Sequence, residues 1–177
     1  MWKKIAIAVV MLILGLVGYA ATRPGTYEVV RSETIQAPAD KVQALITDFH
    51  AWEKWSPWDR LDPQLKRSYS GAASGVGAIY EWKGNDEVGS GRMTITAVDP
   101  GKSVSIKVEF SEPFAAINPT LFTLEASGSA TKVSWKMNGD VMGLPGKLMG
   151  IFMDMDAMIG KDFESGLDNL KAIAEKT

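Results

Sequence analysis

Hydrophobic and polar residues follow three different patterns along the chain. Residues 5–21 form an uninterrupted apolar run, several short stretches of the middle alternate apolar and polar positions, and the C-terminal segment repeats apolar residues every three or four positions. Alternation is typical of β-strands with one buried face, whereas a spacing of three or four is typical of an amphipathic helix. The sequence therefore predicts an apolar N-terminal helix, a linker at residues 22–25, and one α+β domain over residues 26–177.

The apolar run Ile5–Ala21 contains no charged residue and is just long enough to span a bilayer as a helix. Lys3 and Lys4 precede it. By the positive-inside rule, residues 1–4 should then stay in the cytoplasm and the domain should lie on the periplasmic or extracellular side of the membrane.

Two interpretations of this run remain open. A transmembrane anchor is favoured by Trp2 and Tyr19, aromatic residues that would lie in the two membrane interfaces. A cleaved signal peptide is favoured by Gly18 and Ala20, small residues of the kind found before a signal-peptidase site, and the domain would then be secreted.

The domain is predicted to begin with one strand and two short helices, Tyr27–Ile35, Pro38–Thr47 and Phe49–Trp55. Asp48 is the expected N-cap of the second helix. Turns that contain Gly, Pro, Asp or Ser then separate six further strands, which are Gln64–Tyr69, Gly77–Trp82, Val88–Val98, Ser103–Phe110, Phe114–Glu125 and Lys132–Gly139. Each connection is too short for a parallel crossover, so the sheet should be antiparallel.

The last predicted element is a long amphipathic helix over Pro145–Glu175. Its apolar positions are Leu148, Phe152, Met155, Ile159, Phe163, Leu167 and Leu170. The strand Ser103–Phe110 alternates cleanly, so one face of the sheet should be apolar. We expect the helix to cover that face.

Four segments carry a resemblance to a known family: TIQAPADKV (Thr34–Val42), FHAWEKWSPW (Phe49–Trp58), GAIYEWKGN (Gly77–Asn85) and GKDFESGLDNLK (Gly160–Lys171). Together with the order of elements, they resemble the START-like superfamily, also known as SRPBCC, in its polyketide cyclase/dehydrase-like branch. The resemblance implies the helix-grip fold. In this fold a curved antiparallel sheet of about seven strands surrounds a long C-terminal helix, with two short helices after the first strand.

The resemblance also implies a cavity between the sheet and the long helix, which would bind a small hydrophobic molecule or a lipid. Aromatic and methionine side chains on the expected inner surfaces are the candidate ligand-binding residues: Trp52, Trp55, Tyr80, Trp82, Phe110, Phe122, Trp135, Phe152 and Met155. An alternative for the tryptophans is that they only pack the core between the second helix and the sheet.

Two other functions remain open. The branch contains cyclases and dehydratases, so an enzyme acting on a polyketide-like substrate is possible, with Glu81 as a carboxylate to test. The methionine-rich and tryptophan-rich segments would alternatively suit a module that binds another envelope protein. The sequence favours ligand binding over catalysis, because no acid–base pair is evident.

Several classes of chemistry find no support in the sequence. There is no cysteine, His50 is the single histidine, and neither a nucleophile elbow nor a zinc-binding helix is present. We therefore expect no metal and no cofactor. The net charge is −2 and basic residues are scattered, so nucleic acid is not an expected partner.

Overall fold

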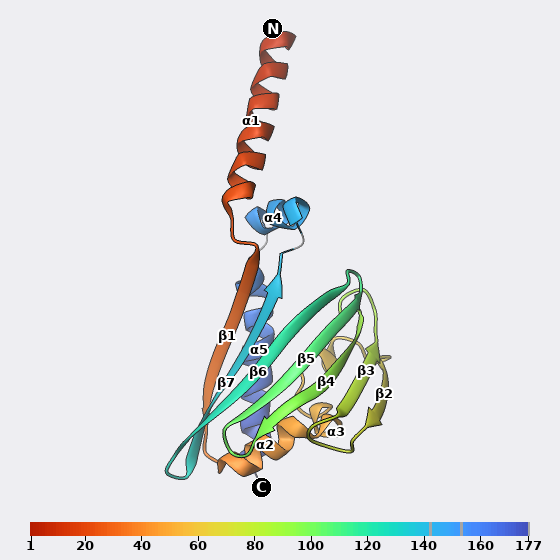
Figure 1. Cartoon of the computed structure of the whole chain (residues 1–177), viewed down its shortest axis with the longest axis vertical. Helices are drawn as coiled ribbons and strands as arrows, with labels where there is room; N and C mark the ends of the chain where they lie inside the picture. The colour runs from red at the N-terminus through yellow and green to blue at the C-terminus, as the bar shows by residue number, and fades with distance from the viewer. Residues whose placement is uncertain (142, 153, 177) are drawn as a thin grey trace.

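The computed structural model describes residues 1–141, 143–152 and 154–176 (Figure 1). Its first elements are α1 (Trp2–Thr22), β1 (Thr26–Ile35), α2 (Ala39–Thr47), α3 (Phe49–Trp52) and the 3₁₀ helix η1 (Trp58–Arg60). Six strands follow, β2 (Lys66–Gly71), β3 (Ala78–Lys83), β4 (Ser90–Asp99), β5 (Ser103–Glu112), β6 (Ala116–Ser127) and β7 (Ala130–Asp140). The chain ends with α4 (Gly143–Phe152) and α5 (Met155–Ala174).

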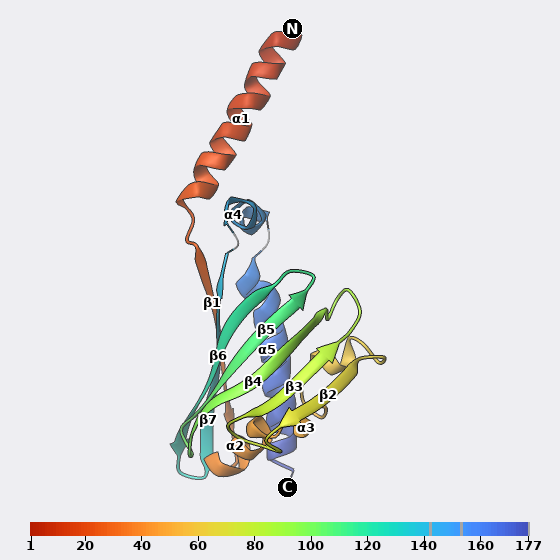
Figure 2. The ribbon, with the colours of Figure 1, turned by 45° about the vertical axis from the view of Figure 1, so that its right-hand side comes forward.

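The seven strands form one antiparallel sheet in the order β1-β7-β6-β5-β4-β3-β2. The sheet curves around α5, and α2 and α3 lie at the end farthest from α1 (Figures 1 and 2). Alternate residues are buried along β5 and β7, as their sequence pattern predicts. The predicted helix-grip fold is therefore confirmed.

The predicted C-terminal helix is wrong in its extent, because two helices occupy the segment. Asp154 has an extended backbone, with φ −87° and ψ 100°, and its side chain accepts a hydrogen bond from the backbone N–H of Ala157 at 3.1 Å. This contact is an N-cap, which starts α5 as a new helix. Leu148 and Phe152 consequently belong to α4 and do not cover the sheet.

Helix α4 lies beside the C-terminal end of α1 instead (Figure 1). The Lys147 ammonium group donates a hydrogen bond to the backbone carbonyl of Ala21 at 3.4 Å. Three large side chains of α4, Leu144, Met149 and Phe152, are exposed. The segment therefore presents apolar surface next to the N-terminal helix.

The second short helix is shorter than predicted. Helix α3 ends at Trp52, and the backbone N–H groups of Trp55 and Ser56 both bond to the Trp52 carbonyl, which closes a turn. The chain then continues through Pro57 into η1. The expected cap is confirmed, because Asp48 accepts a hydrogen bond from the backbone N–H of His50 at 2.9 Å.

Candidate ligand-binding cavity

A cavity of about 330 Å³ lies between the inner face of the sheet and the N-terminal half of α5. The strands contribute apolar side chains to it, among them Met93, Ile106, Val108 and Met137. Helix α5 contributes Met155, Ile159 and Asp162. Because successive residues of a strand point to opposite faces, β5 and β6 place every second side chain along part of their length toward this space.

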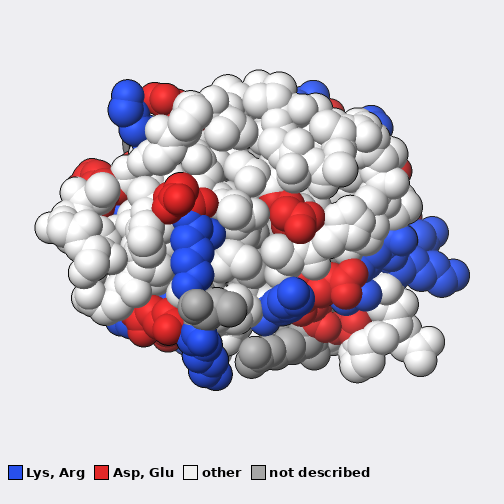
Figure 3. All heavy atoms as spheres, turned by 90° about the horizontal axis from the view of Figure 1, so that it is seen from below, with Lys and Arg blue, Asp and Glu red and all other residues white. Residues whose placement is uncertain are grey.

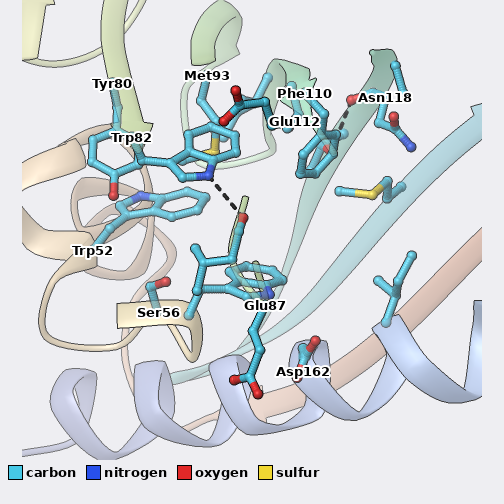
Figure 4. A pocket seen from close by; sticks show the side chains of 18 of the residues that line it. Trp52, Ser56, Tyr80, Trp82, Glu87, Met93, Phe110, Glu112, Asn118 and Asp162 are labelled. Carbon is cyan, nitrogen blue, oxygen red and sulfur yellow. Dashed lines mark hydrogen bonds between the residues drawn. The ribbon is translucent and has the colours of Figure 1, made fainter. Parts of the chain in front are cut away.

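Aromatic rings form one wall of the cavity (Figure 4). The rings of Tyr80 and Trp82 are stacked with centroids 5.9 Å apart, and Phe110 meets Trp82 edge to face at 5.7 Å. The indole N–H of Trp82 donates to the backbone carbonyl of Val88 at 3.3 Å. The indole is thus held in place by packing and by one hydrogen bond, with its surface toward the cavity.

The rim of the cavity is made by two loops, residues 84–89 between β3 and β4 and residues 113–115 between β5 and β6. They contribute Glu87, Val88 and Phe114 to the lining. Both loops lie at the end of the sheet nearest to α1 and α4 (Figure 1). Phe114 is 63% exposed. An apolar side chain therefore stands in solvent at the opening.

Six of the nine candidate residues line this cavity: Trp52, Tyr80, Trp82, Phe110, Trp135 and Met155. The other three lie elsewhere. Trp55 and Phe122 are fully buried in the core, where their rings meet edge to face at 6.4 Å. Phe152 is 78% exposed on α4.

The tryptophans of the segment between α2 and β2 differ in their contact with the cavity. Trp52 and Trp58 line it, while Trp52 and Trp55 both belong to the buried core. The indole N–H of Trp55 donates to the backbone carbonyl of Leu45 at 3.3 Å. This bond connects the turn after α3 to α2.

Polar side chains of the lining were not among the candidates. Asn118 and Thr120 lie on β6 with the same parity as Phe122, so the strand alternation could have placed them inward. Tyr27 and Asp162 also line the cavity. Tyr27 has the same parity on β1 as the buried Val29, and Asp162 lies three residues after Ile159 on α5, so strand alternation and helical spacing could have placed both inward.

Burial changes the protonation chemistry of the lining. It raises the pKa of Asp162, and a hydrogen bond with Trp58 acts in the opposite direction. Burial also raises the pKa of Tyr80 to about 12, so its phenol is neutral at physiological pH. The cavity thus holds a partly desolvated carboxyl group within largely apolar surroundings.

Glu81, the carboxylate suggested for an enzymatic function, lies outside the cavity. It is on the outer face of β3, where its side chain pairs with Arg92 at 3.4 Å and accepts a hydrogen bond from Ser68. Within the described residues, no group of histidine, cysteine, aspartate and glutamate side chains is placed to hold a metal ion.

Residues 26–175 match the sequence profile of the family described as "Polyketide cyclase / dehydrase and lipid transport". The chain belongs to this family. The match extends from β1 to the end of α5, so the polyketide cyclase/dehydrase domain includes the whole sheet and the cavity. No curated protein sequence matches the chain.

Solved structures share the fold at low sequence identity. A protein from Rhizobium leguminosarum has a TM-score of 0.63 at 16% identity, covering 86% of this chain and 96% of its own. The major latex-like protein of Panax ginseng has a TM-score of 0.61 at 13% identity, covering 85% of this chain and 99% of its own. The Aha1 dimer of Colwellia psychrerythraea has a TM-score of 0.59 at 20% identity, covering 84% of this chain and 96% of its own. These identities establish a common fold and no more.

Proposed function

We propose that this protein is a membrane-anchored member of the polyketide cyclase/dehydrase family that binds a small hydrophobic molecule or lipid. The observation that carries the proposal is the cavity of about 330 Å³, whose lining is mostly aromatic and aliphatic. Burial of apolar ligand surface contributes about 25 cal/mol per Å². The few polar groups of the lining would orient the ligand.

Helix α1 supports the membrane part of the proposal. It is long and apolar enough to cross a membrane, and most of its large side chains are exposed. In a bilayer these side chains would contact lipid, and Lys3 and Lys4 would remain on the cytoplasmic side. The domain would then lie on the opposite side, periplasmic or extracellular.

The position of the rim supports exchange of the ligand with the membrane. Exposed apolar side chains of the rim and of α4, including Phe114 and Phe152, lie at the end of the domain nearest to α1. The opposite end carries positive and negative side chains interspersed on a largely uncharged surface (Figure 3). A ligand could thus pass between the bilayer and the cavity over a short, mostly apolar path.

The domain from residue 26 onward is suitable for experiments without α1. The family match begins at residue 26, and the similar solved structures consist almost entirely of the matched part. Ala20 is the buried residue of α1. Ala20 lies outside the core cluster of the domain, and the cavity lining begins at Tyr27, so we expect both to be kept when residues 1–25 are removed.

The deciding experiment is native mass spectrometry of residues 26–177 purified from cells under mild conditions. We expect a fraction with an added mass, and solvent extraction of this fraction should release an apolar molecule. Protein that is empty, and that takes up nothing from a total lipid extract, would show that the cavity does not serve as a binding site.

A further inference from the structure

Asn118 is a polar residue on the apolar inner face of β6, where it lines the cavity and is only 2% exposed. Its amide NH₂ donates a hydrogen bond to the Tyr27 hydroxyl at 2.6 Å. Its side-chain oxygen has no hydrogen-bond partner within the described structure. A buried amide oxygen without a partner is unfavourable, because it has lost its hydrogen bonds to water and gained none in exchange. The cavity lining therefore contains an acceptor that a ligand can satisfy.

The chain makes space for this pair of side chains. Gly139 on β7 lies between β1 and β6 and is paired with Tyr27. A Cβ atom at Gly139 would stand 2.4 Å from Cζ of Tyr27 and 2.5 Å from Nδ2 of Asn118. Tyr27 and Asn118 can thus meet across β7 only because residue 139 has no side chain. The neighbouring strands β1, β7 and β6 thus together place one hydrogen-bonded pair of polar side chains, Tyr27 and Asn118, in an otherwise apolar wall.

This polar position lies on the rim side of the cavity. Asn118 is the third residue of β6 after the rim loop, whereas Thr120 lies one inward-facing position deeper along the same strand. Deeper still, the lining is formed by Trp52 and Trp135. A ligand with one polar end would accordingly place that end at Asn118 and its apolar part against the tryptophans.

The charges of the lining have a single sign. Its described side chains include the carboxylates of Asp59, Glu87, Glu112 and Asp162 and no lysine, arginine or histidine, the side chain of Arg60 being outside the described part. Asp59 forms an ion pair with Arg67, and Glu112 accepts a hydrogen bond from Ser90 at 2.9 Å. An anion that entered this space would meet negative charge and lose its hydration.

We infer that the ligand is a neutral or cationic apolar molecule with a hydroxyl or amine group, which donates a hydrogen bond to Asn118, and that carboxylates and phosphates of similar size are excluded. The inference rests on the proposed function and specifies its ligand class.

Three probes with the same chain and different end groups test the inference: decanol, decylamine and decanoate. Their binding to residues 26–177 is measured by isothermal titration calorimetry at neutral pH, with naphthalene as an apolar probe that has no polar group. We expect decanol and decylamine to bind at least tenfold more tightly than decanoate. The variant Asn118→Leu should weaken decanol binding about tenfold and leave naphthalene binding unchanged, because one hydrogen bond is lost and the apolar wall is kept.

A second variant tests the charge effect on exposed side chains, where folding is not at risk. The double variant Glu87→Gln/Glu112→Gln should strengthen decanoate binding relative to decylamine. Its matched control is Glu81→Gln/Glu125→Gln, which removes the same charge from exposed positions outside the lining and should leave that ratio unchanged.

The outcomes separate this inference from the proposed function. If decanoate binds as tightly as decanol, the selectivity for neutral and cationic ligands is wrong, while an apolar binding site remains. The same conclusion follows if Glu87→Gln/Glu112→Gln and its control Glu81→Gln/Glu125→Gln change the ratio of decanoate affinity to decylamine affinity equally. If none of the probes binds, including naphthalene, the proposed function itself is overturned.

Discussion

Gly166 on α5 lies directly against the indole ring of Trp135 on β7. A Cβ atom at Gly166 would stand 2.8 Å from Cζ3 of Trp135 and 3.2 Å from Cδ of Pro57. The same indole is stacked on Phe163, with ring centroids 4.1 Å apart and an angle of 8° between the planes. A glycine inside a helix costs about 1 kcal/mol relative to alanine. Here this cost is offset by the close approach of the helix to the sheet.

The first prediction concerns this contact. Gly166→Ala should lower the free energy of unfolding by about 1–3 kcal/mol, because the added methyl group overpacks the core although it favours the helix. Urea denaturation of residues 26–177 measures the change. Gly150→Ala is the control, since nothing lies within 4 Å of that position, and it should not destabilise the protein. A more stable Gly166→Ala variant would contradict the close packing.

The second prediction concerns the aromatic wall. Phe110→Ala should weaken binding of an apolar ligand about tenfold, because the ring contributes contact area to the cavity and supports Trp82 edge to face. Displacement of a fluorescent apolar probe measures the effect. Ile117→Ala changes a side chain that is 57% exposed on the outer side of β6 and should leave affinity unchanged. Equal effects of both substitutions would place the ligand outside the cavity.

The third prediction concerns Asp162, whose pKa is raised above the ordinary value of 3.8 mainly by burial. The folded state therefore holds this proton more tightly than the unfolded state, so the contribution of Asp162 to stability is fully present below pH 3.8 and is lost as pH rises through the raised pKa. In Asp162→Asn this decline with pH should be smaller, and the free energy of unfolding at neutral pH should be higher. Denaturation across this pH range measures both effects.

A control for the third prediction is Asp168→Asn, which removes an exposed carboxylate from the same helix. The free energy of unfolding of this variant should depend on pH in the same way as that of the original protein. If Asp162→Asn also kept the full decline, burial of that carboxyl group would not be its source.

The fourth prediction concerns α1. The full chain expressed in a bacterium should remain in the membrane fraction after washing at alkaline pH, and its mass should include residues 1–25. The chain from residue 26 should be soluble, because the apolar surface of α1 is then absent. A mature protein that begins near residue 21 would instead identify the segment as a cleaved signal peptide.

The break between α4 and α5 shows where the sequence pattern misled. Apolar residues recur every three or four positions through Leu148, Phe152 and Met155, so the pattern alone predicts one continuous helix. The Asp154 cap competes with this continuation, and α4 has a separate partner in α1. Two elements at opposite ends of the sequence thus meet, which a local pattern cannot indicate.

By itself, the sequence determined the strands, the alternation of buried and exposed positions along strands such as Ser103–Phe110, the apolar N-terminal helix and the family. These are local properties, since the period of two or of three to four residues follows from backbone geometry. Only the tertiary structure decided which inward side chains pack and which line a cavity. Gly166 allows the C-terminal half of α5 to touch Trp135, whereas the N-terminal half leaves a space beneath the curved sheet at Met155 and Ile159. That space depends on the separation of helix and sheet at each point, a property that no single segment carries.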